Sequence, residues 1–127
     1  MDTPPFVVEE SSDTITGRAP DVSVKILRAL RNGEPPVQAR LDLHGRLRDE
    51  AVRGVERFVA AARARGAKTA LVIHGRGHNS EAGGPVLRPA VWQWLRSLAA
   101  SRAGVMAFAS ARPRDGGAGA TVMLLRR

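Results

Sequence analysis

The sequence contains no cysteine, and this absence excludes disulfide bonds, thiolate zinc sites and a thiol nucleophile. It also contains no apolar run approaching the roughly 18 residues needed to span a bilayer, so we expect no contact with a membrane. The first residues, Met1 to Pro5, are acidic and lack an apolar centre, which argues against a secretory signal. The cytoplasm is therefore the expected compartment, and the length of 127 residues predicts one domain with a tail.

Acidic residues are scarce except near the N-terminus. Residues 1–21 carry five acidic side chains and one arginine, a net charge of −4. Residues 22–127 carry nineteen basic and seven acidic side chains, a net charge of +12, and the whole chain has a pI near 11.6. A basic body of this size favours a polyanionic partner, most often nucleic acid, although a solvated arginine-rich surface is the simpler alternative.

The periodicity of apolar residues divides the chain into a tail, a short helix and a main domain. Residues 1–21 are polar and bear prolines, so we expect a disordered acidic tail, followed by a short helix and linker over residues 22–36. In residues 37–127 the pattern predicts a strand (37–44), a helix (48–64), a strand (69–74), a helix from 87 or 89 to 100, and two strands (105–109 and 120–125). The expected fold is therefore α/β, a two-layer β-α-β-α-β-β arrangement with a four-stranded mixed sheet and two helices.

Two polar segments directly follow strands that the pattern predicts to be parallel. Asp42-Leu43-His44-Gly45 ends the first strand, and His74-Gly75-Arg76-Gly77 ends the second. All three histidines of the chain, at positions 44, 74 and 78, fall in or beside these segments. Because ligands of open α/β sheets bind beyond the carboxyl ends of the strands, we expect both segments to form one site at the same sheet edge.

Asp42 and His44 lie two residues apart and would share one face of a strand. A carboxylate beside an imidazole can fix its tautomer and raise its basicity, so this couple could activate water or a ribose 2′-hydroxyl, or protonate a leaving oxygen. His74 is the third candidate catalytic residue. The structural alternative gives Asp42 a capping role toward backbone N–H groups near Gly45, and leaves His44 as an ordinary histidine at the rim.

The second segment has the composition of a phosphate site. Gly75 and Gly77 permit close approach of the backbone to a phosphate, while Arg76 and Arg46 supply forked donors. Further candidate substrate contacts follow in the same loop, although ordinary loop positions are the simpler interpretation; they are His78, Asn79 and Ser80.

A divalent cation would find acceptable ligands in Asp42, His44 and His74. Two-metal phosphodiester cleavage normally needs several carboxylates, however, and this edge offers one. The sequence therefore permits a divalent cation without requiring any cofactor.

Five segments resemble, in order and spacing, the Smr (small MutS-related) domain over about residues 37–127. They are Leu41 to Gly45, Asp49 to Ala51, Val72 to Gly77, Leu87 to Leu95 and Asp115 to Thr121. The resemblance is to the stand-alone bacterial type, which carries an N-terminal extension such as residues 1–36 here. It implies a fold similar to the C-terminal domain of a bacterial translation initiation factor. The sequence departs from the family pattern at Leu47, where many relatives have Thr or Ser, so the helix cap should be weaker by about 1 kcal/mol.

The resemblance also implies a function. Members of the family are associated with endonuclease activity on DNA or RNA, including cleavage of messenger RNA at stalled ribosomes, so nucleic acid and the ribosome are the implied partners. The family's Asp-x-His motif, carried by Asp42 and His44, is linked to cleavage, and its Gly-x-Gly loop, carried by Gly75 and Gly77, to substrate binding. The leading hypothesis is an endonuclease that acts as a monomer. A non-catalytic module for structured nucleic acid and a hydrolase of small phosphoesters are the alternatives.

Overall fold

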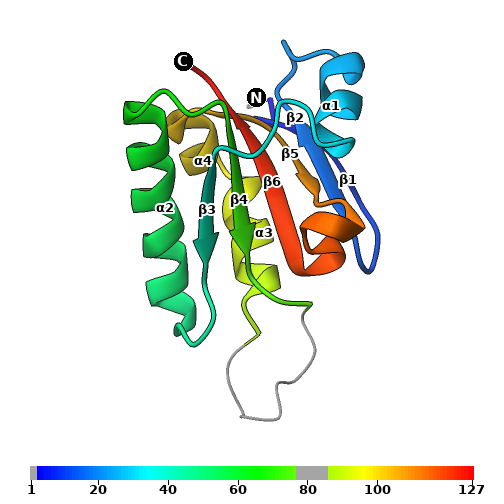
Figure 1. Cartoon of the computed structure of the whole chain (residues 1–127). Coiled ribbons are helices and arrows are strands. Elements are labelled where there is room, and N and C mark those ends of the chain that lie inside the picture. The colour runs from blue at the N-terminus through cyan, green and yellow to red at the C-terminus, as the bar shows by residue number, and fades with distance from the viewer. Residues whose placement is uncertain (1–2, 77–85) are drawn as a thin grey trace.

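The computed structural model describes residues 3–76 and 86–127, and within them the chain forms one mixed sheet of six strands (Figure 1). The elements in chain order are β1 (Val7–Glu10), β2 (Ile15–Arg18), α1 (Val24–Arg31), β3 (Ala39–Asp42), α2 (Arg48–Ala64), β4 (Thr69–Ile73), α3 (Arg88–Leu95), α4 (Leu98–Ala103), β5 (Val105–Ser110), the short 3-10 helices η1 (Pro113–Asp115) and η2 (Gly117–Gly119), and β6 (Ala120–Leu125). The strands lie in the order β1-β2-β5-β6-β4-β3. The α/β class expected from the sequence is confirmed, but the sheet has more strands than the four expected.

β3 and β4 form the parallel pair that the sequence predicts, with α2 as the connection between them. Asp42 is the register partner of Ile73, so the carboxyl ends of both strands reach the same edge of the sheet. β4 lies between β3 and β6 and has its first four residues buried, which explains its continuous apolar sequence. β6 runs antiparallel to both β4 and β5, and therefore begins at the edge where β4 ends.

Helices cover both faces of the sheet. α2, α3 and α4 contact one another on one face, whereas α1 contacts β2, β5 and β6 on the other (Figure 1). The residues of α2 that pack against the sheet recur at helical spacing. Those that are fully buried include Ala51, Val55, Val59 and Ala62. No helix in the described part of the chain has both the length and the apolar character that crossing a bilayer requires.

The expectation of a disordered tail over residues 1–21 is wrong for residues 3–21. β1 and β2 pair as an antiparallel hairpin, and β2 continues the sheet by pairing with β5. Phe6 and Ile15 are 4% and 1% exposed, and the Phe6 ring packs edge-on against Phe108 with the centroids 5.2 Å apart. The polar composition predicted disorder, but two apolar anchors and the backbone edge of β5 provide enough burial and hydrogen bonding to order the segment.

Two helix boundaries also differ from the sequence expectation. The helix expected to end at Ala100 is divided into α3 and α4, because Ser97 accepts a hydrogen bond from the Ala100 N–H and begins a new helix. The first helix begins after Ser23 and not at residue 22, where the expected segment starts, since the Ser23 hydroxyl accepts an N–H from the first turn. Neither difference moves the edge where β3 and β4 end.

Candidate functional site

Three chain segments meet where β3 and β4 end and β6 begins, at the bottom of Figure 1. The Leu43 N–H continues the parallel ladder by donating to the Ile73 carbonyl at 2.9 Å. The N–H groups of His74 and Gly75 both donate to the Gly119 carbonyl at 3.0 Å. The segments that follow β3 and β4 therefore share one edge, as the sequence predicts, and the glycine turn (Gly116–Gly119) joins them there.

The expected catalytic side chains share this edge but not one face of the sheet. Asp42 pairs with Ile73, so Leu43 is the next residue in register with His74, and side chains alternate between faces. Leu43 and His74 are buried, at 0% and 6% exposure, whereas Asp42 and His44 are exposed. A single cluster of both imidazoles and the Asp42 carboxylate is therefore not formed.

The Asp42 carboxylate holds the backbone of its own loop. Its Oδ1 accepts the His44 N–H at 2.9 Å, and the Arg46 N–H donates to the Leu43 carbonyl at 3.0 Å. Gly45 lies between them with φ +79°, a left-handed conformation that glycine adopts without strain. Asp42 thus fills the capping role that the sequence left open as its alternative, and the turn presents His44 to solvent.

His74 is a neutral histidine with both ring nitrogens engaged. Nδ1 lies 2.7 Å from the Gly75 carbonyl, and Nε2 lies 2.8 Å from the Thr121 hydroxyl. Because a carbonyl only accepts, Nδ1 carries the proton and Nε2 accepts from Thr121. The pKa of His74 is lowered to about 4, mainly by burial; the hydrogen bond to Gly75 opposes the shift, and the nearby charge of Arg88 adds to it.

Arg76 runs along the glycine turn. A Cβ placed on Gly119 would lie 3.4 Å from Arg76 Cγ, and one placed on Gly117 would lie 3.7 Å from Arg76 Nη2. Gly116 and Gly117 also have φ values of +116° and +53°, so this turn depends on glycine for its shape as well as for its space. The exposed guanidinium of Arg76 is thus placed by residues about forty positions later in the chain.

Arg46 lies against α2. A Cβ placed on Gly54 would come within 2.8 Å of Arg46 Nη1, so the absence of a side chain there makes room for the guanidinium. Leu47 is the N-cap of α2 and forms no side-chain cap hydrogen bond, as the sequence predicts. The two arginines expected to hold phosphate are therefore positioned by different elements, Arg46 by α2 and Arg76 by the glycine turn.

Comparison with known proteins identifies the domain that carries this edge. A family model described as the Smr domain matches residues 41–126. The chain belongs to the Smr domain family. It is similar to the probable DNA endonuclease SmrA of Escherichia coli strain K12, with 33% identity over 102 residues that cover 80% of this chain and 52% of SmrA. It is also similar to the ribosome rescue factor SmrB of Aliivibrio fischeri strain MJ11, with 35% identity over 83% of this chain and 54% of SmrB.

A solved structure shares the fold. The crystal structure of YdaL, a stand-alone small MutS-related protein from Escherichia coli, superposes with a TM-score of 0.70 at 31% identity, covering 88% of this chain and 82% of YdaL. The chain spans about half the length of the curated relatives SmrA and SmrB. The Smr match begins at Leu41, so the hairpin and α1 precede it, while the glycine turn and Thr121 fall inside it.

Two groups at the edge where β3 and β4 end were not predicted from the sequence as site residues. Thr121 binds His74, and the Gly119 carbonyl binds the two N–H groups that follow β4. A threonine inside the otherwise apolar strand β6 is a usable signal, because a buried histidine needs a polar partner.

The predicted site also includes four residues that follow Arg76 in the chain. Gly77, His78, Asn79 and Ser80 lie outside the described residues. Within residues 3–76 and 86–127, no group of three or more His, Cys, Asp or Glu side chains is arranged to hold a metal ion. The predicted site residues at this edge that are at least partly exposed include Asp42, His44, Arg46 and Arg76.

Proposed function

We propose that this Smr domain is a phosphodiester endonuclease that acts on nucleic acid in the cytoplasm. The observation that carries the proposal is that an exposed histidine, His44, and an exposed arginine, Arg76, belong to the two segments that follow β3 and β4 at one edge of the sheet. Imidazole is the side chain best suited to move a proton near neutral pH, and arginine binds phosphate through a planar fork. Together they supply the two elements that cleavage of a phosphodiester needs.

The charge of the domain supports a nucleic-acid substrate. Residues 22–127 carry a net charge of +12, and the three acidic residues of the described hairpin, Glu9, Glu10 and Asp13, lie on a separate element. A surface with this excess of positive charge attracts a polyanion and gives binding that weakens steeply with salt. This excess supports nucleic acid as the substrate class, and the positions of the arginines at the edge favour contact with the phosphate backbone.

His44 is the proposed general acid–base group. The imidazole would take a proton from an attacking water or 2′-hydroxyl while the oxygen attacks phosphorus, and the imidazolium would return a proton to the leaving oxygen. Arg46 and Arg76 would bind the phosphate groups next to the cleaved bond. Different elements position the two arginines, so they could contact two different phosphates of one strand.

Asp42 and His74 are proposed as positioning residues. The Asp42 carboxylate fixes the turn that presents His44, through the bond to the His44 N–H. His74 lies beneath the edge and joins Gly75 to Thr121, so it shapes the backbone that precedes Arg76. His74 has no free nitrogen for proton transfer in this arrangement, because each ring nitrogen already has a partner.

One observation favours a second function. The Asp42 carboxylate bonds to backbone, and no hydrogen bond joins it to the His44 imidazole among the described residues. A histidine without an orienting carboxylate is a weaker base, so the domain would then be a non-catalytic module that binds structured nucleic acid. This module would use the same arginines and the same edge.

The two functions are separated by cleavage and binding measurements on His44→Ala. We expect the variant to lose about hundredfold or more in plasmid nicking and RNA cleavage, with affinity for the same oligonucleotides retained. Equal nicking by wild type and variant would indicate a contaminating nuclease and would end the endonuclease proposal. Salt-sensitive binding by both proteins, with no cleavage under any metal condition, would establish the binding module.

The relatives suggest which substrates to compare. SmrA is named for DNA and SmrB for ribosome rescue, and the chain is similar to both. We propose the ribosome as a candidate partner, tested by co-sedimentation of the full chain with ribosomes at low and high salt. Supercoiled plasmid and labelled RNA are then compared in the same cleavage buffer, and size-exclusion chromatography tests the proposed monomer.

A further inference from the structure

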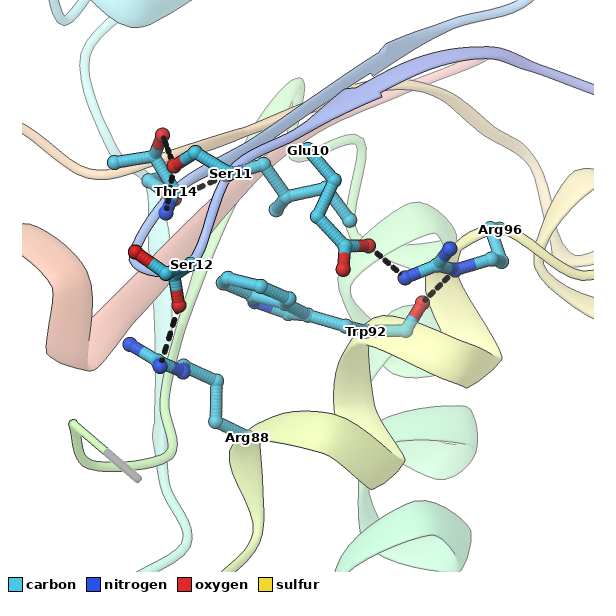
Figure 2. Close-up of polar contacts among 9 residues, drawn as sticks. Glu10, Ser11, Ser12, Thr14, Arg88, Trp92 and Arg96 are labelled. Atoms are coloured by element: carbon cyan, nitrogen blue, oxygen red, sulfur yellow. Dashed lines mark hydrogen bonds and ion pairs between the residues drawn. The ribbon is translucent and has the colours of Figure 1, made fainter. Parts of the chain in front are cut away.

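The hairpin of β1 and β2 has a turn that is closed by its own side chains. The Ser11 hydroxyl accepts the N–H of Thr14 at 3.0 Å and of Asp13 at 3.3 Å, and it lies 2.8 Å from the Thr14 hydroxyl. The Ser11 N–H donates to the Thr14 carbonyl at 2.9 Å. These bonds fix the backbone of the turn, and with it the direction of the Ser12 carbonyl (Figure 2).

Two arginines at the ends of α3 bind this hairpin around Trp92, as Figure 2 shows. Arg88 Nη2 donates to the Ser12 carbonyl at 3.1 Å, and the Arg88 guanidinium carbon lies 4.8 Å from the centroid of the Trp92 ring. Arg96 forms an ion pair with Glu10, and its Nε donates to the Trp92 carbonyl at 3.5 Å. Trp92 is only 5% exposed, so its ring gives the Arg88 guanidinium a fixed surface.

Arg88 also reaches the candidate site. Its Nη1 donates to the Ala118 carbonyl at 3.4 Å, inside the glycine turn. The next residue, Gly119, accepts the N–H groups of His74 and Gly75. One guanidinium therefore connects a hairpin that precedes the family match to the turn that supports the edge of β4.

We propose that Arg88 is a positioning residue that couples the hairpin to the glycine turn and thereby sets the backbone from His74 to Arg76. The consequence for cleavage rests on the proposed function. A guanidinium suits this role because its planar fork donates in two directions while its face stacks on an aromatic ring, whereas the lysine ammonium is a point charge. The Arg88 charge also contributes to the lowered pKa of His74, which agrees with this placement.

Arg88→Lys tests the role with the positive charge kept. We expect amide hydrogen exchange at His74 and Gly75 to quicken about tenfold, while Leu71 in the centre of β4 keeps the wild-type rate. The matched control is Arg102→Lys on the exposed side of α4, which should change none of these amides. Unchanged exchange at His74 and Gly75 would overturn the proposal, and so would an equal rise at all three amides, because that indicates general unfolding.

Ser11→Ala tests the coupling from the hairpin side. The substitution loosens the turn that carries the Ser12 carbonyl, and Ser11 itself makes no contact with the edge of β4 in the described hydrogen bonds. We expect faster exchange at Gly75 in the wild-type background and no further increase in the Arg88→Lys background, because the link is already cut. Additive effects of the two substitutions would overturn the coupling.

Cleavage provides a separate measurement. If the proposed function holds, Arg88→Lys should lower kcat about tenfold with a smaller change in KM, since the variant alters the shape of the edge more than its charge. The exchange measurements do not need cleavage. An inactive wild type would therefore overturn the endonuclease proposal alone, and wild-type exchange in Arg88→Lys would overturn the coupling alone.

Discussion

His74 Nε2 lies 2.8 Å from the Thr121 hydroxyl, and this bond joins the end of β4 to the beginning of β6 beneath the candidate site. Val72 is the register partner of Thr121, so the threonine lies diagonally across the sheet from the histidine and on the same face. The other ring nitrogen donates to Gly75, directly before Arg76. The neutral His74 ring is thus part of the support of the edge, and its protonation would disturb that support.

The first prediction concerns the pH dependence of stability. Burial is the main cause that lowers the pKa of His74 from its ordinary value of 6.5 to about 4, so between these values the unfolded chain binds more protons than the folded one. The stabilising effect of the neutral His74 on the fold is fully present above the pKa of the unfolded chain. It is lost as the pH falls toward the pKa of the folded protein, and the total loss of unfolding free energy is about 3 kcal/mol. Urea unfolding of wild type and His74→Asn at about pH 7.5 and about pH 4 measures it. The stability advantage of the wild type should shrink at the lower pH; an advantage that stays constant contradicts the prediction.

The second prediction separates the Thr121 hydroxyl from the Thr121 methyl group. Thr121→Val keeps the shape of the side chain but leaves a buried ring nitrogen without its donor, which should cost about 1–3 kcal/mol of unfolding free energy. Thr121→Ser keeps the hydroxyl and should lose less than Thr121→Val in the same urea titration. If the serine variant is the less stable of the two, packing of the methyl group matters more than the hydrogen bond to His74.

The parallel pair and its edge could be predicted from the sequence because both signals are local. Alternation from Ala39 to His44 indicates a strand with one wet face, and the apolar run that begins at Thr69 indicates a strand covered on both faces. Two parallel strands joined by one helix must end at the same edge, so the segments after Asp42 and Ile73 meet. The placement of His44 and His74 on opposite faces of the sheet is also predictable once the register is known, since side chains alternate along each strand.

The hairpin could not be predicted because its stability depends on residues far along the chain. β2 pairs with β5 about ninety residues later, and the small residue Gly17 lies under the ring of Phe108. Acidic residues, serine, threonine and proline make up most of residues 1–21, so the composition resembles a disordered tail. The role of Arg88 could not be predicted for the same reason. The two backbone carbonyls that it binds belong to segments that are far apart in the sequence.

The third prediction tests the packing of the hairpin on the sheet. A Cβ placed on Gly17 would lie 2.2 Å from Phe108 Cζ, and Phe108 is fully buried, so the ring has no free space to enter. Gly17→Ala should destabilise the protein by about 1–3 kcal/mol or more through overpacking. Gly66→Ala is the comparison variant, since its Cβ meets nothing within 4 Å and only the positive φ of +80° opposes it.

Thermal unfolding of both variants decides between the two causes. A larger loss for Gly17→Ala, together with faster amide exchange in β1 and β2, supports steric displacement of the hairpin. If Gly66→Ala loses as much stability as Gly17→Ala or more, the Phe108 ring must move to make room for the added methyl group.

The fourth prediction distinguishes the two roles open to Asp42. Its Oδ1 accepts the His44 N–H at 2.9 Å, and an asparagine side chain can accept the same bond through its amide oxygen. If Asp42 positions the turn, Asp42→Asn should retain cleavage within about tenfold of wild type, whereas Asp42→Ala should lose much more because the N–H loses its acceptor. If the carboxylate charge instead takes part in proton transfer, both variants should lose activity equally. Cleavage of one labelled RNA by wild type and both variants, with His44→Ala as the inactive reference, therefore assigns the role of Asp42 by the behaviour of the asparagine variant.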